Sequence, residues 1–236
     1  METPTREIEV RAPQLALASV EWMYQDPFWE ARYGLERARR FGNEDAMFHV
    51  RYLIQALAEE RPSIMEGYAT WLRTLLVSRG MCTLHLDQNF AGLQAALAAE
   101  GFGAGSPAQA YIQAARNALR YPADLARLLQ EQASELARRT AQELLAVVPA
   151  ALHPRLEEEL LIHLSYLADA IGAGHPESFT RHVGWYKGFW PRRAFGELSF
   201  DRLLTALEAA LGASLSNHDE VKAVVAAARP RKERSP

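Results

Sequence analysis

The sequence predicts an all-α protein, a multi-helix bundle built from two tandem repeats related by a pseudo-twofold axis. Three observations support this prediction. Apolar residues recur with a helical period along most of the 236 residues. No segment shows the alternation and β-branched enrichment that are typical of a strand. Finally, one part of the chain aligns with another at an offset of 114 residues (163 − 49).

The repeat is defined by an alignment without gaps of Phe48–Leu97 with Ile162–Leu211. Some matches are expected in a chain rich in Ala and Leu, but matches of rarer residues are harder to attribute to composition. These pairs are His49/His163, Tyr52/Tyr166, Pro62/Pro176, Trp71/Trp185 and Arg79/Arg193. We therefore place internal repeat 1 at about 44–100 and internal repeat 2 at about 155–213, and we expect each to supply a three-helix core.

The elements follow from periodicity. In 43–60, for example, Ala46, Val50, Leu53 and Leu57 are spaced as the apolar side of a helix. Applied along the chain, the same reasoning predicts helices near 6–23, 27–41, 44–60, 62–79, 83–99, 107–119, 122–148, 155–172, 176–190, 199–212 and 217–228.

Residues typical of helix N-termini support several of these boundaries. Asp26 and Ser106 each precede a proline, which combines a capping side chain with a proline at the first helical position. Asn43 precedes two acidic residues, which the helix dipole favours at an N-terminus. Pro62 and Pro176 interrupt the preceding helices at equivalent places in the two repeats.

We expect one helical domain over 1–236. Its clearest linker is the glycine-rich stretch 101–106, which would separate the first repeat from the connecting helices of 107–150. Residues 229–236 are predicted to form a flexible basic tail.

Composition limits the functional class. A net charge of −3 gives no general basic field for nucleic acid or for an anionic membrane. Cys82 is the single cysteine, so neither an internal disulfide nor a thiolate metal cluster is expected. The N-terminus does not resemble a signal peptide, and no apolar run is long enough to cross a membrane. We therefore expect a cytoplasmic protein with no nucleic-acid or membrane partner.

Two acid-x-x-x-His elements are candidate metal ligands. Asp45 and His49 lie one helical turn apart, and Glu159 and His163 are their equivalents in the second repeat. If the repeats pack about a twofold axis, the two pairs could converge on a dinuclear iron or manganese site. Asp45-x-x-x-His49 resembles the element used by haem-oxygenase-like di-iron oxidases, although the remaining ligands of that family are not found. The alternative is structural, with each histidine joining two helices by hydrogen bonds.

The second repeat also contains an unusual concentration of aromatic and histidine residues. We consider five of them as ligands of a flat cofactor such as haem or another tetrapyrrole: His163, His182, Trp185, Tyr186 and Trp190. His163 or His182 would be the axial ligand. The alternatives are ordinary core packing and an exposed patch for a partner.

The repeated tryptophans and arginines favour structural roles. Trp71 and Trp185 are predicted to be core anchors. Arg79 and Arg193 are predicted to bond the last carbonyls of their own helices.

The sequence contains no complete catalytic set. It favours a non-enzymatic helical module that binds a ligand or a protein, in a regulatory or sensory role, and it leaves catalysis open. The alternatives are an oxidase-like non-haem di-metal carboxylate protein and a tetrapyrrole-binding sensor. A homodimer or a partner protein is the expected assembly.

Overall fold

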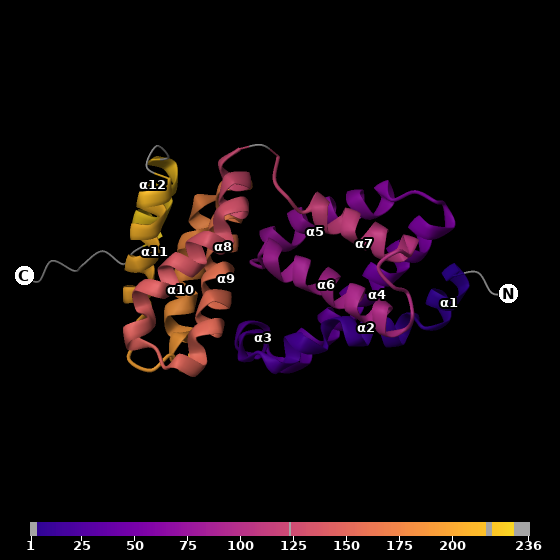
Figure 1. The fold of residues 1–236 in the computed structure, drawn as a ribbon, viewed down its shortest axis with the longest axis horizontal. Helices are drawn as coiled ribbons and strands as arrows, with labels where there is room; N and C mark the ends of the chain where they lie inside the picture. The colour runs from indigo at the N-terminus through magenta and orange to yellow at the C-terminus, as the bar shows by residue number, and fades with distance from the viewer. Residues whose placement is uncertain (1–3, 123, 216–218, 229–236) are drawn as a thin grey trace, which may run out of the picture. The chain divides into compact units, whose positions relative to one another are not determined.

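The computed structural model describes residues 4–122, 124–215 and 219–228, and these ranges are helical, with no strand among them (Figure 1). The predicted all-α class is therefore confirmed. No helix in the described ranges has both the length and the apolar character that a membrane span needs. The predicted tail 229–236 and the predicted start of the last helix at 217 lie outside the described residues.

The chain forms two compact units. The first contains 1–78 and 85–120, and the second contains 79–84 and 121–236. The two units divide after Arg120 and not at the predicted linker 101–106. That stretch instead joins two helices inside the first unit. Packing of the two repeats about a pseudo-twofold axis into a single domain stays a prediction.

The first unit contains eight helical segments within the described residues. They are α1 Pro4–Val10, α2 Ala12–Val20, the 3-10 helix η1 Glu21–Gln25, α3 Pro27–Tyr33, α4 Leu35–Ala58, α5 Ser63–Ser78, most of α6 Thr83–Ala99, and α7 Pro107–Ala118. In this unit α2 packs on α4, and α5 packs along α7 (Figure 1). The α5–α7 contact is supported by Arg73, whose guanidinium donates to the carbonyl of Leu119 at 2.8 Å, past the end of α7.

The second unit contains the remaining helices. They are α8 Leu125–Leu144, η2 Leu145–Val147, η3 Ala150–Leu152, α9 His153–Gly172, α10 Pro176–Phe189, η4 Trp190–Arg193, α11 Phe200–Ser214 and α12 Asp219–Ala228. The helices α8 and α9 lie side by side, and α10 packs on α9 and α12 (Figure 1).

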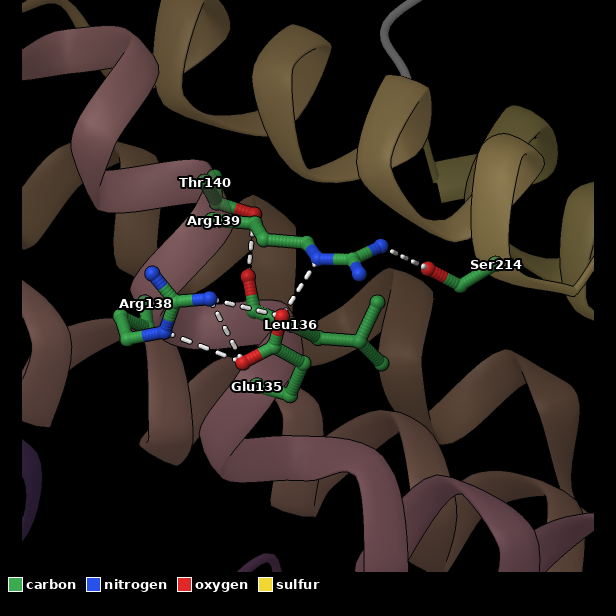
Figure 2. Close-up of polar contacts among 6 residues, drawn as sticks. All are labelled: Glu135, Leu136, Arg138, Arg139, Thr140 and Ser214. Carbon is green, nitrogen blue, oxygen red and sulfur yellow. Dashed lines mark hydrogen bonds and ion pairs between the residues drawn. The ribbon is translucent and has the colours of Figure 1, made fainter.

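Exposed polar groups join α8 to α11. Figure 2 shows Arg138 and Arg139 of α8 bonded to Glu135 of the same helix, with Arg139 also 3.4 Å from the hydroxyl of Ser214 on α11. All of these groups lie at the surface, where solvent screens ion pairs. Substitutions in this exposed cluster can therefore serve as controls for substitutions in a buried ion pair of the same unit.

Most predicted boundaries agree with the structure. Asp26 caps α3 by accepting from the amide of Phe28 at 2.8 Å, and Ser106 caps α7 by accepting from the amide of Gln109 at 3.4 Å. Ala46, Val50 and Leu53 are fully buried, as the periodicity of their helix predicts.

The predicted helix break near Asn43 is wrong. The helix α4 runs continuously through Asn43, and the break lies at Gly34 instead. Gly34 has a φ of 80°, which a residue with a side chain rarely adopts, and its conformation ends α3 and begins α4. The predicted helix 6–23 also divides, because the ring of Pro13 in the first turn of α2 is incompatible with an uninterrupted helix.

A close helix contact in the first unit depends on Gly92 of α6. A Cβ atom at this position would lie 2.2 Å from the backbone carbonyl oxygen of Ser19 on α2. Backbone atoms have little freedom to move away, so the helices would have to separate. Gly67 of α5 offers the opposite case, because a Cβ there would meet no atom within 4 Å.

We expect Gly92→Ala to lower the free energy of unfolding by about 1–3 kcal/mol, the usual cost of overpacking. Gly67→Ala is the matched control and should instead raise it by about 1 kcal/mol, because alanine favours the helix. Urea denaturation of both variants checks the prediction. A neutral or stabilising Gly92→Ala would show that α2 and α6 do not approach as closely as the structure indicates.

Candidate functional site

The two repeated histidines join helices in the same way. In the first unit, Nδ1 of His49 on α4 and the hydroxyl of Tyr68 on α5 share a hydrogen bond of 2.7 Å. In the second unit, Nδ1 of His163 on α9 and Nε2 of His182 on α10 share one of 2.9 Å. Both histidines are buried. These hydrogen bonds between helices are the ones that the structural interpretation of the histidines predicts.

The neighbouring rings also correspond. Tyr52 stacks on Tyr68 with centroids 3.9 Å apart and planes at 15°. Tyr166 stacks on His182 with centroids 3.6 Å apart and planes at 14°. Positions that the sequence alignment pairs therefore make the same bridge and the same stack, each within its own unit.

The acids of the two pairs differ. Glu159 is 2% exposed and forms an ion pair of 3.0 Å with Arg193, which is equally buried. The hydroxyl of Tyr186 donates to Glu159 and accepts from Arg193 at 2.8 Å. Asp45 is only half-buried, and its charge, after burial, is a cause of the raised pKa of Tyr68.

The ion pair changes the interpretation of Arg193. Arg193 was expected to bond the last carbonyls of its own helix, but η4 turns its side chain into the interior of the second unit, against Glu159. Its guanidinium also lies 5.0 Å from the ring centroid of Phe189. Such an arrangement satisfies a buried charge and fixes η4 on α9 and α10.

Burial lowers the pKa of His49 to about 3, and burial together with the charge of Arg193 lowers the pKa of His163 to about 3. Both rings are therefore neutral at pH 7. In addition, Nε2 of each is buried and has no hydrogen-bond partner among the described residues, although Nε2 of His163 lies 3.8 Å from Glu159. A proton added at either ring would be costly.

These pKa values predict acid sensitivity. Between about pH 6.5 and pH 3, His49 and His163 bind protons in the unfolded chain but stay unprotonated in the folded chain. The free energy of unfolding therefore falls as the pH is lowered through this range. At pH 5 the loss is about 2 kcal/mol for each histidine. We expect His49→Gln to lose about 2 kcal/mol less than the wild-type chain between pH 7 and pH 5. Urea denaturation at both pH values measures this, and equal losses would contradict the assignment.

The predicted metal ligands lie in different units, Asp45 and His49 in the first and Glu159 and His163 in the second. Among the described residues, no group of three or more His, Cys, Asp or Glu side chains is arranged to hold a metal ion. The charge of Glu159 is balanced by Arg193. The iron or manganese hypothesis gains no support from this geometry and stays a prediction.

The predicted tetrapyrrole ligands form a cluster in the second unit. His163, His182, Tyr186 and Trp190 are buried, whereas Trp185 is half-buried and stacks on Phe189. The buried rings contact one another: the centroids of His163 and Tyr186 are 4.6 Å apart. A flat ligand would have to separate these contacts, so the arrangement favours core packing, and the tetrapyrrole hypothesis stays a prediction.

Trp71 corrects a sequence-based expectation. Its side chain is 56% exposed on α5 and is not a core anchor. It lies 6.2 Å from Tyr68, measured between ring centroids. Its counterpart Trp185 is only half-buried, so neither repeated tryptophan is a fully buried core anchor as predicted.

An exposed aromatic surface on α4 was missed by the sequence analysis. Phe41 and Phe48 are seven residues apart, on one side of the helix, and are 39% and 47% exposed. Arginines cover their rings. Arg40 and Arg37 lie 4.7 Å and 5.4 Å from the centroid of Phe41, and Arg51 lies 5.7 Å from that of Phe48. We call Arg37, Arg40, Phe41, Phe48 and Arg51 the α4 face.

Aromatic contacts link the helix of the α4 face to α5. Tyr52 follows Phe48 by one helical turn, so it shares this side of α4. Tyr52 stacks on the buried Tyr68, and the ring of Tyr68 lies 6.2 Å from that of the exposed Trp71, so aromatic contacts connect α4 to α5. The spacing of the two phenylalanines, with arginines around them and away from the buried Ala46 stripe, was the signal available in the sequence.

Comparison of the chain with protein-family models, with curated proteins and with solved structures found no match.

Proposed function

We propose that this chain is a non-enzymatic helical module that binds a partner protein through the α4 face of its first unit. The observation that carries the proposal is the exposure of Phe41, Phe48 and Trp71, three large rings on two packed helices. Aromatic and arginine side chains are enriched at protein interfaces, where they contribute much of the binding energy.

The distribution of the exposed apolar residues supports this choice. Among the described residues, the large hydrophobic side chains that are exposed lie mainly in the first unit: Val10, Leu17, Leu35, Phe41, Phe48 and Trp71, with Leu145 in the second. The polar groups that suggested chemistry have the opposite character, since His49, Glu159 and His163 are buried in contacts that stabilise the fold. A binding function can use the exposed hydrophobic side chains, whereas a catalytic function would require substrate to reach the buried histidines and the buried carboxylate.

The matched contacts also support a proposal about origin. His49, Tyr52 and Tyr68 in one unit and His163, Tyr166 and His182 in the other make the same hydrogen bond and stack. We infer that the two segments are copies of one ancestral helical unit. Divergence then explains why the second copy buries a cluster of aromatic rings, whereas the first exposes Phe48 and Trp71.

Capture of a partner in the producing cell tests the proposed function. A photocrosslinking residue placed at Glu44, beside both phenylalanines, should form a covalent adduct with a partner protein. The adduct should be lost in Phe41→Ser/Phe48→Ser and kept in Leu145→Ser, the matched control for an exposed apolar residue of the other unit. An adduct that is insensitive to the double substitution would refute the role of the α4 face.

A further inference from the structure

The positive charges of the α4 face are not all neutralised. Arg40 lies 3.9 Å from Glu44, which sits between the two phenylalanines on the same side of the helix. Arg37 and Arg51 contact the rings but have no acidic partner within the described part of the chain. The face therefore has an aromatic middle, where Arg40 is paired with Glu44 and the half-buried Asp45 also lies, and one arginine without an acidic partner near each end.

The spacing of these groups along α4 sets the dimensions that a complementary surface on a partner must have. At 1.5 Å per helical residue, Phe41 and Phe48 are about 10 Å apart along α4, and Arg37 and Arg51 are about 21 Å apart. A straight helix with two apolar residues seven positions apart would match the rings. Acidic residues beyond each of them would match the arginines.

Charge argues against a second copy of this chain as the occupant. If two α4 faces packed in antiparallel fashion, Arg37 of one would oppose Arg51 of the other. If they packed in parallel, each arginine would oppose its own copy. Like charges brought together at an interface destabilise it, so the same feature that favours an acidic occupant disfavours self-association.

The geometry points to an acidic amphipathic helix of another protein as the occupant of the α4 face. This inference rests on the proposed function and names the chemistry of the partner. The apolar side of the partner helix would cover Phe41 and Phe48, with Asp or Glu residues paired with Arg37 and Arg51.

A display library tests the inference without knowledge of the partner. The probe is a library of helical peptides of about 18 residues, which is long enough to span the roughly 21 Å between the two arginines, with randomised residues on one side, selected against the full chain. Binders that also bind Phe41→Ser/Phe48→Ser are removed. We expect the selected peptides to carry apolar residues seven positions apart with acidic residues outside them, and to bind more weakly as salt is raised.

Charge reversal gives the decisive comparison. Arg37→Glu/Arg51→Glu should weaken the selected peptides at least about tenfold, and replacing their acidic residues by lysine should restore binding to this variant. Neutral or basic selected peptides that still need both phenylalanines would overturn the acidic partner while leaving the proposed function standing. If no peptide is enriched, or if the chain dimerises in solution and the phenylalanine variant does not, the inference fails.

Discussion

Arg193→Met should lower the free energy of unfolding by about 3–5 kcal/mol, the range for removing one member of a buried ion pair. The variant removes the cation that lies 3.0 Å from Glu159 and leaves that carboxylate 98% buried without its counter-charge. Tyr186 would remain as a hydrogen-bond donor to Glu159, but a hydroxyl does not balance a full charge. Urea denaturation followed by circular dichroism measures the effect.

Two controls separate the buried charge from the loss of an arginine. Arg138→Met removes a cation from the exposed cluster of Figure 2, where solvent screens the pair, and should leave stability unchanged within error. Glu159→Leu/Arg193→Met removes both charges and should be more stable than Arg193→Met alone. If Arg193→Met costs less than about 1 kcal/mol, the Glu159 carboxylate is not held as a buried anion.

Asp169→Ala should also destabilise the chain by about 3–5 kcal/mol, since it removes several hydrogen bonds to one buried carboxylate. Asp169 of α9 accepts from the backbone amide of Thr83 at 2.7 Å, from the hydroxyl of the same residue, and from the hydroxyl of Tyr121 at 2.9 Å. It therefore caps the N-terminus of α6 from a different helix. Alanine would leave the buried amide of Thr83 without this acceptor.

Hydrogen exchange locates the effect of this substitution. Amide protection should fall at Thr83 and at Leu84. The amide of Leu84 donates to the hydroxyl of Ser165, which lies on α9 as Asp169 does. Asp201→Ala is the control, because Asp201 pairs with Lys187 at the exposed surface of α11; it should cost no more than about 1 kcal/mol and should leave exchange near α6 unchanged. Unchanged protection at Thr83 in Asp169→Ala would mean that α9 does not hold the start of α6.

Local sequence signals predicted the fold class and many helix ends. Asp26 and Ser106 act where they are placed, because a capping side chain bonds an amide only two or three residues away. The prediction of a helix start at Asn43 was wrong because tertiary contacts override the local capping signal. Gly42 brings α4 against Tyr24, whose hydroxyl bonds the amide oxygen of Asn43, so the helix continues through that point.

The site was predictable only in part, because burial depends on neighbours that the sequence does not identify. The bridging role of His49 and His163 followed from their repetition, but their partners Tyr68 and His182 did not. Arg193 and Trp71 show the same limit. Each aligns with a residue of the other repeat, yet η4 buries the arginine and α5 exposes the tryptophan.

The division of the chain has a consequence for anyone who wishes to study one unit alone. The second unit includes 79–84, a short stretch that precedes most of α6 and α7 in the sequence. Tyr166 of α9 donates to the carbonyl of Gly80 at 3.0 Å, so this stretch is bonded within that unit. A gene fragment that starts after the glycine-rich linker would omit it. The shortest continuous fragment that encodes all of the second unit starts at Arg79 and necessarily carries α6 and α7 with it.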